Sequence, residues 1–112
     1  MASVRAPFRE VRRRDGTLAP FDAERIVEAV LAALRETGRP ERALAERVTR
    51  GVIDALAARG VDRAPELEEI QDEVERVLMQ LGLVDAARAY VLYRRRRAEL
   101  REAKRLLGVR DE

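Results

Sequence analysis

The sequence contains no cysteine, no histidine and no tryptophan, and aromatic residues make up only 4% of its 112 residues. Without cysteine and histidine the chain cannot form disulfides, thiolate nucleophiles, imidazole bases or zinc sites of the usual kinds. No apolar run approaches the length of about 18 residues that a membrane-spanning helix needs, and residues 1–8 lack the apolar core of a signal peptide. These absences argue against most enzyme classes and predict a cytoplasmic protein that does not enter a membrane.

Charged and aliphatic residues dominate what remains. Charged residues make up 39% and hydrophobic residues 46% of the chain, enough for one small domain with an aliphatic core. The formal net charge is only +2, which does not indicate a general nucleic-acid binder. Lys104 is the only lysine, so arginine supplies nearly all of the positive charge. Arginine binds phosphate well through its planar fork, but a GC-rich coding sequence would also enrich it.

Apolar residues at helical spacing predict four helices, at about 23–37, 41–59, 66–81 and from 84 or 85 to 106 or 107. Asp22 is suited to cap the first helix, and Phe21 and Ile26 have the spacing of a hydrophobic staple. Short connections between helices that each carry one apolar stripe indicate a bundle around a single core.

A small β-structure is expected before the helices. Asp15-Gly16 lies between two short extended stretches and predicts a two-residue hairpin turn with positive φ at both residues. Residues 61–65 could add a third short strand. The predicted fold class is therefore α+β, mostly α: a four-helix bundle capped by a small N-terminal β-hairpin or three-stranded sheet.

Two segments near the N-terminus could bind phosphate. Arginines 12–14 beside the Asp15-Gly16 turn would suit an oligophosphate, and strand alternation points Arg13 away from its two neighbours. The start of the first helix, residues 22–26, offers a positive dipole, the Arg25 charge and the apolar Ile26. Each segment also fits a simpler interpretation, a solvated charged hairpin and an ordinary capped helix.

Two further charged segments lie near the C-terminus. Residues 94–97 are four consecutive arginines that cover every side of a helix, so they form either a nucleic-acid stripe or a solvated face. The acidic residues between 66 and 75 could form a metal or acid/base pair, or a solvated face; no further ligand supports a metal site. Gln71 differs from them as a neutral group that could contact a sugar hydroxyl or base edge.

In order along the chain, these motifs resemble the ATP-cone family, the regulatory nucleotide-binding domain of many ribonucleotide reductases and of a related transcriptional repressor. Val11-Arg-Arg-Arg-Asp-Gly16 resembles the family's Val-x-Lys-Arg-Asp-Gly. The resemblance continues through Pro20-Phe21-Asp22 and Ile26, residues 69–75, and Ala89-Tyr-Val-Leu-Tyr-Arg94. It indicates a flexible lead over 1–8, a nucleotide-binding domain over 9–97 and a helical extension over 98–112 that leads toward a partner or parent enzyme.

The resemblance implies a non-catalytic domain that binds ATP or dATP, with Mg²⁺, between the hairpin and the helices. It would control a reductase through changes in quaternary structure, with the reductase catalytic subunit or domain as partner and homo-oligomers possible. No catalytic residue and no protein metal site are expected. The residues implied at the nucleotide are Val11, Arg13, Arg14, Asp22, Arg25, Ile26, Glu69, Gln71 and Arg96.

Several features depart from the family pattern or qualify it. Arg13 replaces the usual lysine, and Leu67 stands where a hydroxyl residue often precedes the third helix. Glu69 could then recognise the adenine amino group instead. The segment 101–110 resembles the part that follows the domain in adenosylcobalamin-dependent (class II) reductases. The repressor relatives carry a cysteine-rich zinc ribbon, which this chain lacks. Three alternatives remain: a nucleotide-responsive transcriptional regulator, a basic nucleic-acid-binding helical module using residues 94–97, and an adaptor that binds only protein.

Overall fold

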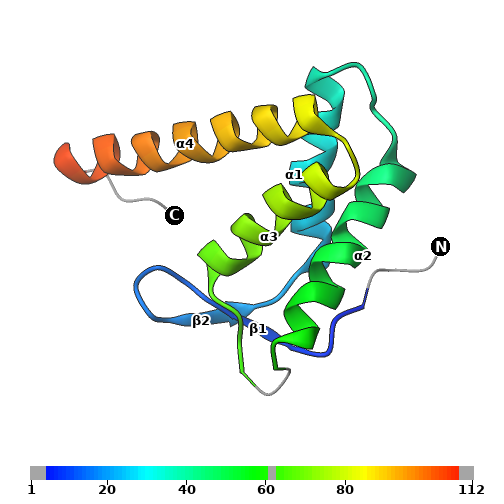
Figure 1. Ribbon diagram of the computed structural model, residues 1–112. Helices are drawn as coiled ribbons and strands as arrows, with labels where there is room; N and C mark the ends of the chain where they lie inside the picture. Colours follow the sequence, from blue (N-terminus) through cyan, green and yellow to red (C-terminus); the bar gives the residue numbers. More distant parts are fainter. Residues whose placement is uncertain (1–4, 61–62, 109–112) are drawn as a thin grey trace.

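The computed structural model describes residues 5–60 and 63–108 of the chain. Two antiparallel strands, β1 (Glu10–Arg12) and β2 (Leu18–Pro20), precede four helices. The helices are α1 (Ala23–Glu36), α2 (Arg42–Ala58), α3 (Leu67–Gln80) and α4 (Val84–Leu106). The hairpin lies at one end of the bundle, and α4 crosses the other end and extends past α1 and α3 (Figure 1).

The expected mostly helical fold is confirmed, and the helix ends lie within about one residue of their predicted positions. Local chemistry explains this agreement at the start of α1. The Asp22 carboxylate accepts a hydrogen bond from the backbone N–H of Glu24 at 3.0 Å. That bond satisfies a donor that has no partner within the helix.

The core forms where the apolar stripes of the helices meet. Val30 and Leu34 of α1, Val48 and Val52 of α2 and Leu78 of α3 are completely buried. Such aliphatic burial away from water supplies the main driving force for folding the bundle.

Phe8 belongs to this core, although it was expected in a flexible lead. Its side chain is buried, and its ring meets that of Phe21 edge-on, with 4.7 Å between centroids. Residues 5–8 therefore pack against the domain, whereas the rest of the expected lead, residues 1–4, lies outside the described residues.

The hairpin turn differs from the prediction. The N–H of Arg13 donates to the carbonyl of Thr17 and that of Gly16 donates to Arg13, which leaves a three-residue loop. Within the described residues only glycines have positive φ, so Asp15 does not adopt it and Gly16 does, at 88°. The physical reason is the Asp15 carboxylate, which accepts from both the backbone N–H and the hydroxyl of Thr17, at 2.9 and 2.6 Å.

The third strand is replaced by a single parallel bridge. The N–H of Arg12 donates to the carbonyl of Pro65 at 2.9 Å, and Arg12 pairs with Glu66. Val61 and Asp62 lie outside the described residues, and the described part of the chain forms a sheet of two strands. The bridge nevertheless fastens β1 to the segment that leads into α3.

Candidate functional site

A cavity of about 320 Å³ lies beneath the hairpin. Its walls come from both strands, from the start of α1 and from the first turn of α3. Five of the nine residues implied by the resemblance line it: Val11, Arg13, Asp22, Arg25 and Ile26. The remaining lining residues are Ala19, Pro20, Phe21, Leu67 and Ile70.

The hairpin contributes residues from one side of β1 and its turn. Val11 and Arg13 are two residues apart and both line the cavity. Arg12 does not line it and instead donates to the carbonyl oxygen of Gly16 at 2.7 Å. Arg14 does not line it either, and its guanidinium pairs with Glu68 of α3 at 3.1 Å. The Arg13 side chain therefore points away from those of Arg12 and Arg14, as strand alternation predicted.

The start of α1 supplies the polar corner of the cavity. Asp22 is held by its capping bond, and the positive end of the α1 dipole lies behind it. Arg25 is exposed and adds a positive charge, whereas Ile26 is buried and presents an apolar surface. Phe21 and Ile26, which have the spacing of a hydrophobic staple, both line the cavity.

Leu67 and Ile70 of α3 form the opposite, apolar wall. The sequence marked Leu67 only as a departure from the family pattern, and neither Leu67 nor Ile70 was among the expected site residues. The three-residue spacing that places both on one face of α3 was visible in the sequence. The sequence did not show which other element this face of α3 would pack against.

Glu69, which was expected to recognise the adenine amino group, does not line the cavity. Its carboxylate accepts both guanidinium N–H groups of Arg63 at 2.9 Å and the backbone N–H of Glu66 at 2.9 Å. These bonds lower the pKa of Glu69 to about 2. Because Glu69 follows Leu67 by two residues, the helix turns it toward the loop before α3 and away from the cavity wall.

Gln71 lies one turn after Leu67 and is bound to α4. Its amide oxygen accepts from Nε of Arg94 at 3.0 Å. The same guanidinium donates to Asp72 at 3.0 Å and to Glu75. Burial alone would lower the pKa of Arg94, but the bonds to Glu75 and Asp72 outweigh it and raise this pKa above its ordinary value.

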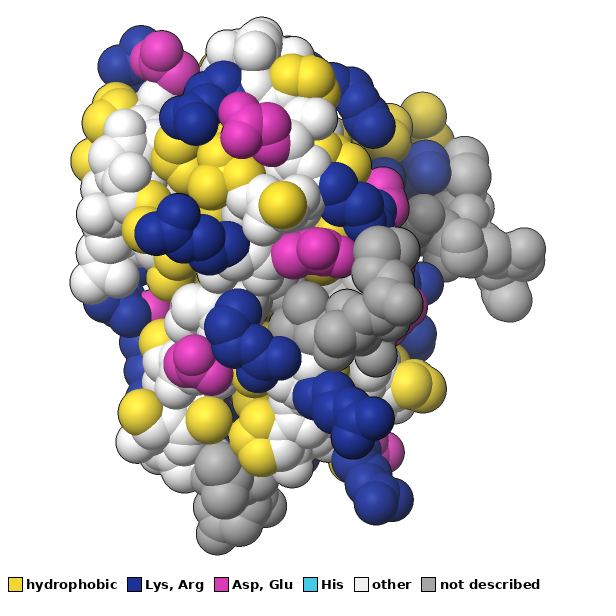
Figure 2. Space-filling view, turned by 90° about the vertical axis from the view of Figure 1, so that its right-hand side faces the viewer, with side chains coloured by type: hydrophobic (Ala, Val, Ile, Leu, Met, Phe, Trp, Pro, Cys, Tyr) yellow, Lys and Arg dark blue, Asp and Glu magenta, His cyan; other side chains and the backbone are white. Residues whose placement is uncertain are grey.

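The remaining arginines of the run at 94–97 are exposed, and Arg96 does not line the cavity. Elsewhere, the face of the molecule on the α2 side shows Lys and Arg side chains interspersed with Asp and Glu rather than gathered by sign (Figure 2). Of the four arginines at 94–97, Arg94 is bonded to residues of α3 and the other three are exposed. This division weakens the interpretation of the run as a nucleic-acid stripe.

The acidic residues of α3 are used for packing between elements. The Glu73 side chain is only 1% exposed, and it is neutralised by Arg59, which follows the end of α2, and by Arg76 of α3. Among the described residues no group of three His, Cys, Asp or Glu side chains could hold a metal ion, and no helix is long and apolar enough to cross a membrane.

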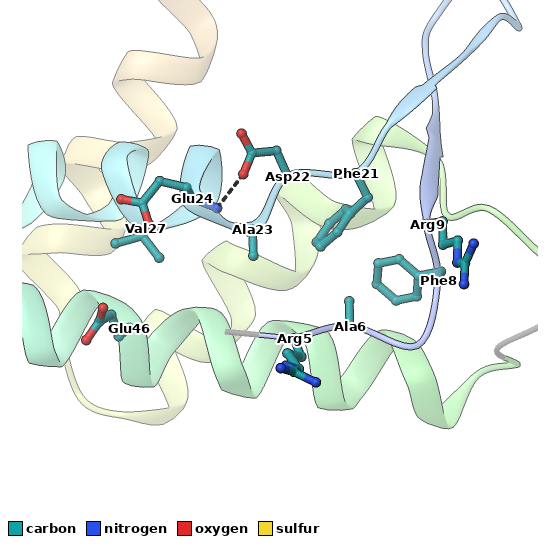
Figure 3. A pocket seen from close by; sticks show the side chains of 10 residues that line it. All are labelled: Arg5, Ala6, Phe8, Arg9, Phe21, Asp22, Ala23, Glu24, Val27 and Glu46. Atoms are coloured by element: carbon teal, nitrogen blue, oxygen red, sulfur yellow. Dashed lines mark hydrogen bonds between the residues drawn. The ribbon is translucent and has the colours of Figure 1, made fainter. Parts of the chain in front are cut away.

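A second cavity, of about 440 Å³, lies on the other side of Phe21. The edge-on pair of Phe8 and Phe21 rings lies toward one end of it, with Arg9 beyond Phe8 (Figure 3). Arg5 also lines this cavity. Glu24 and Glu46 lie at the other end, where Arg42 pairs with both. Phe21 and Asp22 line both cavities and therefore form the partition between them.

Comparison with known proteins gives one consistent result. Residues 9–99 match the family described as the ATP cone domain. The chain is 55% identical over 103 residues to a vitamin B12-dependent ribonucleoside-diphosphate reductase of Mycobacterium tuberculosis (strain CDC 1551 / Oshkosh), covering 92% of this chain and 14% of that protein. It is 38% identical over 111 residues to the reductase of the same name from Thermoplasma acidophilum, covering 94% of this chain and 14% of the relative. It is also 41% identical over 100 residues to the ribonucleoside-diphosphate reductase subunit alpha of Chlamydia pneumoniae, covering 82% of this chain and 10% of that protein. The chain thus spans about one seventh of the length of the first two relatives.

Proposed function

Because this chain belongs to the ATP-cone family, we propose that the cavity beneath the hairpin binds ATP or dATP. In this proposal the domain is a non-catalytic regulator of a ribonucleotide reductase. The observation that carries the proposal is the convergence of Val11 and Arg13 with Asp22, Arg25 and Ile26 on one cavity. These residues come from two separate segments of the chain, and all five belong to the set that the family resemblance implies.

The lining of the cavity suits a nucleotide. Its volume of about 320 Å³ lies within the range of small-molecule sites. Ile26, Leu67 and Ile70 offer an apolar surface to a base. Arg13, Arg25 and the positive end of α1 offer charge to phosphates.

Magnesium would arrive with the phosphates rather than occupy a protein cage. Mg²⁺ keeps several waters and often binds through substrate phosphates and one or two carboxylates. Asp22 is the carboxylate that lines the cavity. It would contact the ion directly or through water while it continues to cap α1.

Regulation requires that the nucleotide bind two states of the enzyme with different affinity. A coupling of about 1–3 kcal/mol is typical. In this proposal ATP and dATP favour different quaternary states of the reductase, whose catalytic part is the partner, and homo-oligomers are one such state. The nucleotide would bind at the hairpin end of the domain. The part of α4 that extends beyond the bundle would be available to contact the rest of the enzyme (Figure 1).

The test removes one hairpin charge at a time. Arg13→Gln should weaken ATP affinity at least tenfold in calorimetry, because a charge-assisted hydrogen bond contributes about 1.5–3 kcal/mol. Arg12→Gln removes the same charge from the neighbouring position outside the cavity and should change affinity less than twofold. Arg96→Ala, titrated alongside, tests whether the phosphates extend as far as α4. Equal affinities for wild type and Arg13→Gln would reject this site.

A further inference from the structure

Gln71 and Arg94 connect α3 to α4 beside the cavity. Leu67 and Ile70 line the cavity, and Gln71 does not. Gln71 follows Leu67 by one helical turn, so it lies on the same face of α3, at the border of the cavity. Arg94 reaches it across the helix interface, where Nε donates to the amide oxygen at 3.0 Å. The Arg94 side chain is 20% exposed, in contrast to the exposed arginines that follow it.

Two carboxylates hold this guanidinium in place. Nη1 of Arg94 donates to Asp72 at 3.0 Å and to Glu75. Both acceptors lie on α3, as does Gln71, so a single α4 side chain binds three residues within about one turn of the facing helix. A partly buried guanidinium with three acceptors has little freedom to turn.

The chemistry of arginine then fixes the orientation of the Gln71 amide. A guanidinium can only donate hydrogen bonds, so the glutamine must present its oxygen to Arg94. The two amide hydrogens are therefore what Gln71 can offer to any other group. Without Arg94 the amide could rotate by half a turn and present an acceptor instead.

We propose that Arg94 is a positioning residue for nucleotide binding, which holds Gln71 so that its amide N–H group donates to an oxygen of the bound nucleotide's sugar. This inference rests on the proposed function, because it requires a nucleotide in the cavity. Arg94 itself does not contact the ligand. Its role differs from that of the three arginines after it, although all four lie in one run.

The composition of the chain allows a direct test by NMR. The sequence has two glutamines, Gln71 and Gln80, and no asparagine, so only two side-chain amide pairs arise in a ¹H–¹⁵N spectrum. Gln71→Ala assigns them. In the wild type, ATP should shift the Gln71 pair and leave that of exposed Gln80 in place. In ligand-free Arg94→Ala, the Gln71 pair should move to the position of a solvated amide.

Calorimetry on the same variants separates positioning from a direct contact. Arg94→Ala and Gln71→Ala should each weaken ATP affinity about tenfold, and the double variant should bind within twofold of either single variant. Arg95→Ala, which changes the next, exposed arginine of α4, is the matched control and should bind like the wild type. Gln71→Glu keeps the acceptor for Arg94 but has no donor, so it should lose at least tenfold in affinity while its Tm is unchanged or higher.

Each contrary result has a distinct meaning. Wild-type affinity in Arg94→Ala or Gln71→Glu would overturn the inference, as would a double variant about a hundredfold weaker, because independent losses multiply. If Arg94→Ala fails to fold, Gln71→Glu alone decides the matter. No heat and no spectral shift with wild type and either ATP or dATP would overturn the proposed function itself, which distinguishes the two failures.

Discussion

Three consecutive arginines of the hairpin have three different environments. Arg12 donates to the carbonyl of Gly16, Arg13 lines the cavity and Arg14 pairs with Glu68. Their chemistry is the same, so the side of the strand and the geometry of the turn decide which one can meet a ligand. The turn in turn depends on Gly16, whose φ of 88° is costly for residues with a Cβ.

Gly16→Ala should therefore weaken both the hairpin and nucleotide binding. The added methyl group would meet no atom within 4 Å, so the cost is conformational only, about 1–2 kcal/mol. We expect lower ATP affinity in calorimetry, because the distorted turn no longer fixes Arg13. Gly16→Asn is the control, since asparagine tolerates this backbone conformation better. Equal losses for alanine and asparagine would contradict the conformational explanation.

At the scale of elements, α3 joins the parts of the molecule that the proposed site uses. Leu67 and Ile70 form a wall of the cavity. Glu69 and Glu73 pair with arginines at or after the end of α2, and Arg94 binds the face toward α4. The acidic run that could have indicated a metal or acid/base pair thus holds α3 against its neighbours.

Glu69→Gln should lower thermal stability in a pH-dependent way. The bonds from Arg63 and from the Glu66 backbone hold the folded-state pKa near 2, below the ordinary value of 4.5. A lowered pKa means that the carboxylate stabilises the fold above about pH 4.5 and that this contribution fades as pH falls toward 2. The Tm gap between wild type and variant should be widest at pH 7 and close near pH 2.

Glu36→Gln provides the comparison for that experiment, because Glu36 is an exposed residue at the end of α1. It should show a small Tm difference across the same pH range. A gap for Glu69→Gln that stays constant with pH would show that the ion pairs do not contribute through the charge of Glu69.

At the scale of the whole molecule, a ligand in the cavity would touch the hairpin, α1 and α3 at once. The bridge between Arg12 and Glu66 and the pair between Arg14 and Glu68 already fasten the hairpin to the start of α3. A polyphosphate bound to Arg13 and Arg25 would add a third attachment, to α1. Binding should therefore stabilise the fold as one unit.

A thermal-shift comparison measures this coupling. A nucleotide at a hundred times its Kd adds about 2.7 kcal/mol, which for a domain of this size raises Tm by roughly 10 °C. We expect ATP and dATP to produce such shifts, and GTP and inorganic triphosphate to produce smaller ones. Equal shifts with triphosphate alone would contradict recognition of the base, and steeply salt-dependent DNA binding without any nucleotide shift would favour the nucleic-acid alternative.

The sequence by itself determined the features that depend on near neighbours. Helical periodicity and end signals placed the four helices, and the Asp22 cap and the Phe21–Ile26 staple placed the start of α1. Strand alternation also separated Arg13 from Arg12. The exact turn was missed even though it is local, because the Asp15 carboxylate bonds to Thr17 and changes the loop length.

Only the tertiary structure decided which charges pair and which remain for a ligand. The Glu69 carboxylate is bonded to Arg63. The Gln71 amide is bonded to Arg94, and these two residues are 23 positions apart in the chain. Leu67, which departs from the family pattern, became part of the cavity wall because α3 packs with that face toward the hairpin. Helical spacing fixes which residues share a face, but the partner of that face is set by packing between distant segments, and no local pattern encodes it.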